Sequence, residues 1–549
     1  MVFSRADALR RLDGEDFDVL VVGGGITGAG VALDAASRGL RTALVERDDF
    51  ASGTSSKSSK LVHGGIRYLQ QKEIRLVYEA LAERQVLRKT APHLVRVLPF
   101  LLPVFTHDGI LPRRLARLLG TTMWLYDLTG GARIGRLHRR VSKDEALSYM
   151  PTLPAQRLAA SYVYYDAQAD DARLTLAVAR TAADHGAAVA NYARLVGLDK
   201  GADGRVTAAR VEADGRTIVV RARAVVNATG VWADDVRALD EGAHPSSIRP
   251  AKGVHLTVPW SLVRNRIAVV VPVPKDRRSV FVVPWGERDD GTFTFTYIGT
   301  TDTDYDGPLD DPQCTPDDVE YLLRAINASV TTPIGPGDVL GTWAGLRPLV
   351  RDAGSARTAD LSRRHSVRTS PAGVVTVTGG KLTTYRRMAA DAVDEVVRVL
   401  GVDARSRTKH LRLHGVTGWD SPDLPRELAT RYGGDARDVL ALARADARLG
   451  EPLVPGLPTI RAEVVYAARA EMARTVDDVL SRRTRVRILA RDASAAAADE
   501  VAGLMAGELG WDEAERRRQA ERYRAAVAAE RAAAQLPETA LAARLRPPS

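Results

Sequence analysis

Residues 18–46 have the sequence DVLVVGGGITGAGVALDAASRGLRTALVE, and this stretch decides the fold. The apolar run 18–22 predicts a short buried β-strand, and 31–39 predicts a helix that ends at Gly39. Residues 42–46 predict a second apolar strand. A strand, a helix and a strand in this order are typical of a parallel sheet covered by helices.

Three glycines lie in the turn between the first strand and the helix. Gly23, Gly25 and Gly28 have the spacing that allows a tight turn, a close approach of a pyrophosphate and close helix packing. Glu46 ends the second strand, where a carboxylate can accept a hydrogen bond from a ribose hydroxyl. The motif predicts a dinucleotide site, but it does not distinguish NAD from FAD.

Three further segments favour a flavin. The stretch 52-SGTSSKSSKLVHGGIRYL-69 offers many hydroxyl and backbone donors to a second phosphate or to the edge of an isoalloxazine ring. The segment 225-VVNATG-230 predicts a strand that ends in a turn of small residues. The segment 376-TVTGGKLTTYRRMA-389 predicts a strand, a Gly-Gly turn and a helix start. Lys381 in that turn can stabilise negative charge on a reduced flavin.

The composition bounds the class of protein. The chain has 549 residues, 45% hydrophobic and 27% charged residues, which is ordinary for a folded protein and excludes a mainly disordered one. One cysteine, Cys314, excludes an intramolecular disulfide and favours a reducing compartment. The sequence predicts neither a secretory signal nor a transmembrane helix. The net charge of +10 favours anionic partners only weakly.

The remainder of the chain divides into segments by composition and hydrophobic periodicity. Helices are predicted over 72–90, 172–185 and 381–400, and strands over 187–198, 205–213, 217–227 and 373–378. The stretch 251–305 is rich in Val, Thr, Phe and Tyr and predicts an antiparallel sheet. After about residue 405 the pattern becomes helical, as in 461–483 and 511–534, and 537–549 predicts a loose tail.

Together these segments resemble the D-amino-acid-oxidase-type flavoprotein superfamily, and more closely the FAD-dependent glycerol-3-phosphate dehydrogenases. The resemblance covers nearly the whole chain. It rests on VVGGGITGAG, GTSSKSSKLVHGGIRYL, YYDAQADDARL, NATGVWADD, KGVHLTVP, YIGTTDTDYDG, AGLRPL, SRRHSV and GGKLTTYR.

The resemblance implies an α/β plus α+β architecture in three parts. The oxidoreductase region would span 1–400, with a Rossmann-like FAD-binding domain over about 15–90, 160–250 and 355–400. An interleaved antiparallel-sheet substrate domain would take about 91–159 and 251–354. An all-helical C-terminal domain would follow over 405–536, with dimerisation or support of the substrate domain as its open roles.

The resemblance also assigns the cofactor FAD and its contacts, with no metal. The ADP part would contact Gly23, Gly25, Gly28, Glu46, Leu195, Ala228, Thr229 and Gly230. The path from the pyrophosphate to the flavin would be lined by Thr54, Ser55, Ser58, Ser59, Lys60 and Leu61. The ring would meet His63, Gly64, Gly65, Gly380, Lys381, Leu382 and Thr383. Lys57 stands where a small residue would also fit, and we expect this added cation near a phosphate.

The implied reaction moves a hydride from C2 of sn-glycerol 3-phosphate to flavin N5 and yields dihydroxyacetone phosphate. The substrate phosphate needs Arg or Lys, and the candidates are Arg67, Arg347 and Arg363. Arg364 beside Arg363 leaves open which of the two points inward. His255 is the first candidate for the base and His63 its competitor, since an imidazole pKa near 6.5 suits proton acceptance. Tyr68 and Thr384 are weaker candidates for positioning substrate.

The family passes its electrons to membrane quinone, which implies a cytoplasmic enzyme on the inner face of the cell membrane. Between residues 91 and 140 there are eight Arg and two Asp, a net charge of +6. Apolar residues such as Leu115, Met123 and Trp124 lie among them. The segment predicts either a surface for an anionic membrane or an ordinary basic helix packed on the protein.

Two alternatives stay open. One is an oxygen-using glycerol-phosphate or amino-acid oxidase of the same superfamily. The other is a basic nucleic-acid-binding module, which the sequence disfavours because it lacks any recognisable reading motif. We therefore expect no nucleic-acid partner, and a homodimer is one option for the oligomeric state.

Overall fold

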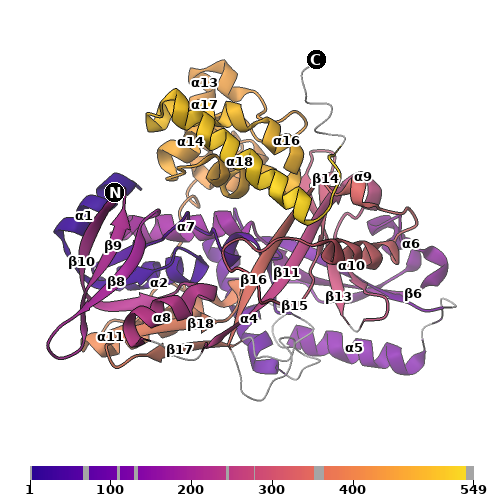
Figure 1. The fold of residues 1–549 in the computed structure, drawn as a ribbon. Helices are drawn as coiled ribbons and strands as arrows, with labels where there is room; N and C mark the ends of the chain where they lie inside the picture. Colours follow the sequence, from indigo (N-terminus) through magenta and orange to yellow (C-terminus); the bar gives the residue numbers. More distant parts are fainter. Residues whose placement is uncertain are drawn as a thin grey trace.

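The structure is a computed structural model that describes residues 3–65, 73–107, 110, 112–128, 134–242, 246–276, 278–350 and 364–539. Two sheets lie side by side, and the C-terminal helices lie across one side of both, at the top of Figure 1. The expected fold class is confirmed: an α/β sheet with helices, a mostly antiparallel second sheet and an all-helical C-terminal region.

The first sheet contains the predicted strand–helix–strand unit. β1 (Asp16–Val22) pairs in parallel with β2 (Thr42–Val45) and with β10 (Arg216–Asn227). The strand order is β17-β18-β10-β1-β2-β7, and β8 and β9 extend the sheet from β10. The remaining bounds are β7 (Ala188–Ala190), β8 (Arg194–Lys200), β9 (Val206–Ala213), β17 (His365–Thr369) and β18 (Val374–Gly379).

Alternating apolar residues bury both faces of this sheet. Val19 and Val21 of β1 pack with α2 (Ile26–Ser37), α7 (Asp171–Asp184) and α11 (Tyr385–Leu400). Leu20 and Val22 face the opposite side, where α1 (Arg5–Gly14) and β9 complete a second core. Near-continuous apolar runs are what a parallel strand buried on both faces requires.

The second sheet has the order β15-β11-β14-β13-β12-β4-β6-β3, with β16 paired to β11 and β5 paired to β6. The bounds are β3 (Leu61–Val62), β4 (Arg96–Phe105), β5 (Arg139–Val141), β6 (Leu158–Gln168), β11 (Ile248–Pro259), β12 (Ala268–Pro272), β13 (Ser279–Glu287), β14 (Phe293–Gly299), β15 (Thr303–Asp304) and β16 (Gly341–Val350). The FAD-binding domain was expected to resume at residue 160. β6 continues to Gln168 in the second sheet, where it pairs with β4 along its length.

The helices outside the first sheet fall into two groups. Around the sheets lie α4 (Ile74–Thr90), α5 (Arg113–Leu128), α6 (Lys143–Tyr149), α8 (Ala233–Glu241), α9 (Trp260–Val263) and α10 (Pro316–Asn327). The C-terminal region, residues 405–536, contains α12 (Arg426–Tyr432), α13 (Ala436–Ala445), α14 (Ala462–Ala470), the π-helix η10 (Asp478–Arg483), α15 (Val486–Leu489), α16 (Arg491–Ala496), α17 (Ala498–Leu509) and α18 (Glu513–Ala533).

The helical pattern over 461–483 is interrupted, contrary to expectation. α14 ends at Ala470, and Met472 adopts a positive φ of 56°. Glu471 at this break is buried and pairs with Arg173 of α7 at 2.8 Å. The chain therefore leaves the helix where it docks onto the first sheet's helices.

Candidate active site

The glycine turn is as tight as its spacing predicts. Gly23 has a φ of 108°, and a Cβ there would lie 2.7 Å from the carbonyl oxygen of Ala228. A Cβ on Gly28 would lie 1.8 Å from the carbonyl oxygen of Gly23. The turn thus brings the start of α2 against the ends of β1 and β10, where only glycine fits.

A cavity of about 380 Å³ opens beyond this turn, at the carboxyl ends of the parallel strands. Crevices in this position are the usual ligand sites of open α/β sheets. The predicted cofactor residues that line it are Gly23, Gly25, Glu46, Thr54, Ser55, Leu195, Ala228, Thr229, Gly230, Gly380, Lys381 and Leu382. The cavity therefore joins segments from both ends of the first 400 residues.

Glu46 supplies the carboxylate of this cavity. Its Oε2 accepts a hydrogen bond from the Gly24 N–H at 2.6 Å, and its Oε1 accepts one from the Asp48 N–H at 2.8 Å. Burial raises the pKa of the Glu46 carboxyl to about 7, against the lowering effect of these two donors. Additional hydroxyl donors would stabilise its charged form.

The first half of the serine loop, which we define as residues 54–60, meets the start of α2. Gly25 caps α2 without a side chain, and the Ser55 Oγ accepts a hydrogen bond from the Ile26 N–H at 2.9 Å. Thr54 donates to the carbonyl oxygen of Leu346 at 2.5 Å. The amino end of a helix lined by small hydroxylated residues suits a phosphate group.

The second half of the serine loop does not line this cavity, so its expected cofactor contacts stay a prediction. Ser58 donates from both N–H and Oγ to Asp171, at 2.9 and 2.7 Å. The Lys60 Nζ lies 3.3 Å from the same carboxylate, and Leu61 is buried in β3. Burial, together with the charge of Arg485, lowers the pKa of Lys60 to about 8.

The glycines after the loop pack against two different segments. The His63 N–H donates to the Thr383 Oγ1 at 3.1 Å, which joins this segment to the turn that contains Lys381. The Gly64 N–H donates to Asp166, and a Cβ on Gly64 would lie 2.6 Å from Leu81. Burial lowers the pKa of His63, with the charge of Lys381 contributing. His63 is thus neutral and close to the cavity's far end.

His255 is buried on β11 between aromatic side chains. Its ring stacks on Trp343 at a centroid distance of 4.7 Å, and its Nε2 lies 2.9 Å from the Ser59 Oγ. Its Nδ1 makes no hydrogen bond with the described residues. Burial, with the charges of Lys60 and Arg347, lowers the pKa of His255 well below the ordinary imidazole value of 6.5. His255 is a neutral imidazole with one nitrogen available as an acceptor.

Arg347 lies on the neighbouring strand β16. Its Nη1 pairs with Asp302 at 3.0 Å, and its Nη2 donates to the Thr301 carbonyl at 3.1 Å. A Cβ on Gly253 would lie 2.5 Å from the same guanidinium, so the glycine makes room for the arginine. The side chain keeps 24% exposure. The arginine is thus held in place and partly exposed.

The other predicted cations behave differently. Arg67, Tyr68 and Arg363 lie outside the described residues. Arg364 is 59% exposed and pairs with Glu73 at 2.9 Å, so it points outward. The Lys57 Nζ lies 4.0 Å from Asp311 and lines a second cavity, which corrects the expectation of a cation near the cofactor phosphate.

Comparison with known proteins assigns the family. A family model described as FAD dependent oxidoreductase matches residues 18–386. The chain belongs to this FAD-dependent oxidoreductase family. A second model, described as the C-terminal domain of alpha-glycerophosphate oxidase, matches residues 388–516. The two matches together cover the two sheets and most of the helical C-terminal region.

Curated relatives match over nearly the full length. The glycerol-3-phosphate dehydrogenase 2 of Mycobacterium tuberculosis is 41% identical and aligns with 96% of this chain and 90% of its own. The human mitochondrial glycerol-3-phosphate dehydrogenase is 38% identical over 93% of this chain and 73% of its own.

A solved member of the FAD-dependent oxidoreductases has the same overall fold. The glycerol-3-phosphate dehydrogenase of Bacillus halodurans, complexed with FAD, has a TM-score of 0.76 and 30% identity, and covers 96% of this chain and 97% of its own. The L-alpha-glycerophosphate oxidase of Mycoplasma pneumoniae, at 19% identity and a TM-score of 0.54 over 72% of this chain, shares the fold.

The residues of the cavity fit FAD. The glycine turn leaves no room for side chains where a pyrophosphate would approach, and the amino end of α2 faces the same space. Glu46 is a buried carboxylate whose raised pKa calls for further donors, and ribose hydroxyls are such donors. Gly380 and Lys381 border the end of the cavity that the flavin's pyrimidine edge would take.

Two carboxylates of the site received no role from the sequence. Asp171 binds the serine loop, and Asp166 accepts hydrogen bonds from Gly64, Arg84 and Tyr126 beneath the glycine pair. Both lie in YYDAQADDARL, a segment used only for the resemblance. Four acidic or amide side chains in that stretch, beside a strand end, were the available signal, but their partners are far away in sequence.

Proposed function

We propose that the protein oxidises sn-glycerol 3-phosphate to dihydroxyacetone phosphate with bound FAD. The observation that carries the proposal is the match to glycerol-3-phosphate dehydrogenases over both the oxidoreductase region and the C-terminal region. Bound FAD supplies the acceptor for the hydride that leaves C2 of the substrate.

The residues of the chain have separate tasks in this reaction. Arg347, fixed by Asp302 and partly exposed, binds the substrate phosphate. Arg67 and Arg363 are proposed for the same phosphate. His255 accepts the proton of the C2 hydroxyl at its available Nδ1, since the buried imidazole is neutral. Lys381 stabilises negative charge at the pyrimidine edge of the flavin.

Anaerobic addition of glycerol 3-phosphate to the purified holoprotein tests this function. The yellow flavin absorbance should bleach within the dead time of manual mixing, and dihydroxyacetone phosphate should form in equal amount to the flavin. Glycerol without phosphate, D-alanine and glycine are the matched controls, which should leave the absorbance unchanged. Bleaching by an amino acid alone would contradict the proposal.

A second candidate function is an oxidase that reacts with oxygen. The match of residues 388–516 to the C-terminal domain of alpha-glycerophosphate oxidase favours it. In air, an oxidase forms one hydrogen peroxide for each substrate oxidised. A dehydrogenase forms little peroxide and turns over rapidly only when a quinone analogue is added.

We propose membrane quinone as the acceptor and a peripheral position on an anionic membrane surface on the cytoplasmic side. No described helix is long and apolar enough to cross a membrane. Of the ten exposed large apolar side chains in the described part of the chain, seven lie between residues 74 and 137. These seven, which we call the apolar edge, are Ile74, Tyr78, Val97, Ile110, Trp124, Leu128 and Leu137.

Five of the seven residues of the apolar edge lie within the basic segment 91–140 that the sequence singled out. Trp124 is 55% and Leu128 is 77% exposed near the end of α5, whereas Met123 is buried and is no lipid contact. α5 runs along the bottom of Figure 1, on the side away from the C-terminal helices. Apolar side chains among arginines are the pattern of an interfacial helix.

Sedimentation with lipid vesicles tests the surface. The protein should bind vesicles with anionic phospholipid and bind neutral ones weakly, and Trp124→Ser with Leu128→Ser should release it. Charge reversal of Arg113, Arg114 and Arg117 should do the same. Val402→Ser, at an exposed apolar residue outside the edge, is the matched control. Equal binding by all variants would place the contact elsewhere.

A further inference from the structure

One short segment of the C-terminal region, residues 482–485, carries three arginines whose side chains contact the FAD-binding part of the chain. Arg482 and Arg483 reach Asp49, which lines the same second cavity as Lys57, while Arg485 reaches Asp171 and the serine loop. All three side chains are buried or nearly so. These contacts join the C-terminal region to two different loops of the FAD-binding part.

Arg485 makes the deeper of these contacts. Its Nη2 donates to the carbonyl oxygen of Ser56 at 2.8 Å and to the Asp171 Oδ1 at 2.7 Å, and its side chain is 3% exposed. Its backbone has a φ of 65°, a region that side chains rarely adopt. Such a conformation persists only where the surroundings fix it, as the two bonds do here.

Asp171 transmits this contact to the serine loop. The oxygen that does not face Arg485 accepts both the N–H and the Oγ of Ser58, at 2.9 and 2.7 Å. The Lys60 Nζ lies within 3.5 Å of either oxygen. The carboxylate is fully buried, so each of its charged hydrogen bonds is strong and costly to break.

The serine loop in turn holds His255. The Ser59 Oγ lies 2.9 Å from the His255 Nε2, and the Ser58 carbonyl accepts the Trp343 indole N–H at 3.1 Å. Trp343 stacks on His255 with its ring nearly parallel, at an interplanar angle of 6°. The loop thus fixes His255 both through a hydrogen bond and through the aromatic ring beneath it.

We propose that Arg485 is a positioning residue for the oxidation reaction, acting through Asp171 and the serine loop on His255. The inference rests on the proposed function, because it assigns His255 to that reaction. It gives the C-terminal region a part in the chemistry besides its part in folding. Displacing a proton acceptor by about 1 Å can slow a reaction by about 100-fold, so the effect is measurable.

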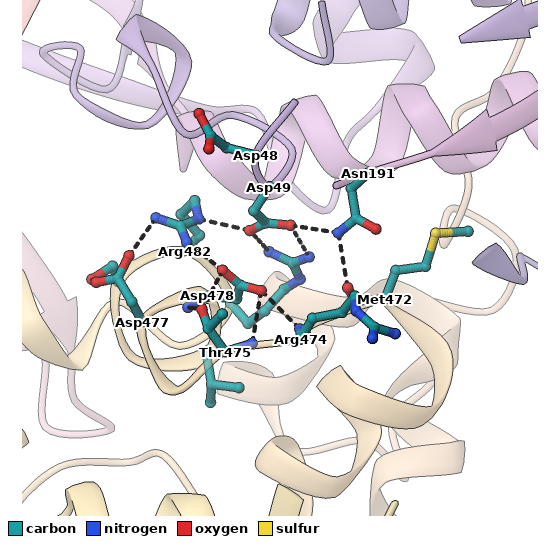
Figure 2. Close-up of polar contacts among 12 residues, drawn as sticks. Asp48, Asp49, Asn191, Met472, Arg474, Thr475, Asp477, Asp478 and Arg482 are labelled. Carbon is teal, nitrogen blue, oxygen red and sulfur yellow. Dashed lines mark hydrogen bonds and ion pairs between the residues drawn. The ribbon is translucent and has the colours of Figure 1, made fainter. Parts of the chain in front are cut away.

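Arg483 provides a matched control on the same interface. Its guanidinium binds Asp49 through two bonds at 2.7 and 2.8 Å, and its side chain is 2% exposed. Asp49 also accepts a hydrogen bond from Asn191, and Figure 2 shows it between Asn191 and Arg482 of η10. Among the described residues, the Asp49 carboxylate binds Asn191, Arg482 and Arg483 and makes no hydrogen bond with the serine loop. Arg483 therefore holds the same C-terminal region in place but makes no contact with the serine loop, which positions His255.

The experiment compares Arg485→Met and Arg485→Lys with Arg483→Met and Arg483→Lys in the full-length holoprotein. The measurement is the limiting rate of anaerobic flavin bleaching by glycerol 3-phosphate, expressed per bound flavin, together with KM, FAD content and Tm. We expect all four variants to lower Tm. Only the Arg485 variants should lower the rate per flavin, by about 10- to 100-fold with KM nearly unchanged.

The lysine variant keeps the test decisive if methionine prevents folding. Arg485→Lys keeps the charge but lacks the second guanidinium nitrogen, which binds the Ser481 carbonyl while Nη2 binds Ser56 and Asp171, so its rate should fall between those of the wild type and the methionine variant. Ser59→Ala removes the link to His255 without changing the interface, and it should slow bleaching at unchanged Tm. Rates per flavin within twofold of wild type in the Arg485 variants, or equal losses in the Arg483 variants, would overturn the inference. Failure of the wild-type flavin to bleach would instead overturn the proposed function.

Discussion

At the scale of single residues, Glu46 carries a testable pH dependence. Its carboxyl has a pKa of about 7 in the protein without bound ribose, because burial disfavours the charge. Ribose hydroxyls donate hydrogen bonds to the ionised form, so FAD binding favours loss of the proton. FAD affinity should therefore rise as the pH rises through 7 and fall, by up to about tenfold per pH unit, below it.

Fluorescence titration of the apoprotein with FAD at pH 6, 7 and 8 measures this effect. Glu46→Gln cannot ionise and should bind FAD more weakly at pH 8, with an affinity that no longer changes with pH. Equal wild-type affinities at pH 6 and pH 8 would show that Glu46 does not face the ribose.

His255 offers a second prediction at this scale. His255→Asn keeps a hydrogen-bonding side chain but removes the proton acceptor, so the bleaching rate should fall by about 100- to 10,000-fold. Bound FAD should remain, because His255 does not line the cofactor cavity. Stopped-flow absorbance with an FAD assay separates the two effects. A variant that bleaches at the wild-type rate would leave the proton to another group.

Residues whose requirement is local could be predicted from the sequence. Gly23, Gly28 and Glu46 follow from the sterics and chemistry of one turn, and the structure places them in that turn. The contact between His255 and Ser59 could not be predicted, because it spans 196 residues. The lowered pKa of His255 has the same origin, since burial is a property of the assembled sheet.

At the scale of elements, the β1–α2 turn sets the third prediction. An added methyl group at Gly28 would meet the Gly23 carbonyl at 1.8 Å, so the turn must shift. Gly28→Ala should lower the free energy of unfolding by about 1–3 kcal/mol and abolish FAD retention. Gly507→Ala is the matched control, since a Cβ there has no atom within 4 Å in α17 and should stabilise by about 0.5–1 kcal/mol. Denaturant unfolding with and without FAD measures both; a stable, yellow Gly28→Ala protein would contradict the expectation.

The elements themselves were mostly predictable, and their ends less so. Apolar runs and helical periodicity predict β1, α2, β18 and α18 within a few residues of their observed bounds. The stretch 461–483 shows why periodicity alone fails. Its spacing is helical throughout, yet the helix ends at Ala470, where Glu471 turns to meet Arg173 of a distant helix. Docking onto another element decides that end.

At the scale of the whole molecule, Asp49 is the point where the C-terminal region is fastened to the FAD-binding part. Although burial opposes it, Arg483 and Arg482 hold the pKa of Asp49 below its ordinary value. Asp49→Asn removes the carboxylate that the buried Arg483 binds through two hydrogen bonds, whereas Arg482 keeps Asp477 and Asp478, and it should cost about 3–5 kcal/mol of folding free energy. Differential scanning calorimetry should show a lower Tm, and a separate early transition would mark undocking of the C-terminal region. An unchanged Tm in the Asp49→Asn variant would show that Asp49 is not the fastening point.

The lowered pKa of Asp49 also predicts a pH dependence. The stabilisation that Asp49 provides is present at neutral pH and is lost as the pH falls through the folded pKa of Asp49.

The architecture was predictable in outline because a resemblance carries topology that local patterns do not. The interleaving of the two sheets follows from family order, and the structure has strands of each sheet on both sides of residues 91–159. The way in which the parts meet was not predictable. Nothing in the local sequence distinguishes Arg482, Arg483 and Arg485 from the surface arginines around them. Only the structure shows that their side chains are buried.

The strand order of the first sheet governs when the protein can take up its cofactor during synthesis. β1 is made within the first 22 residues, but its neighbour β10 ends at Asn227 and β18 ends at Gly379. The cavity is closed by residues 380–382, so a ribosome must release more than two thirds of the chain before FAD finds a complete site. Arg482–Arg485 emerge later still. A nascent chain stalled before residue 380 should therefore remain colourless, because FAD can bind only late in synthesis.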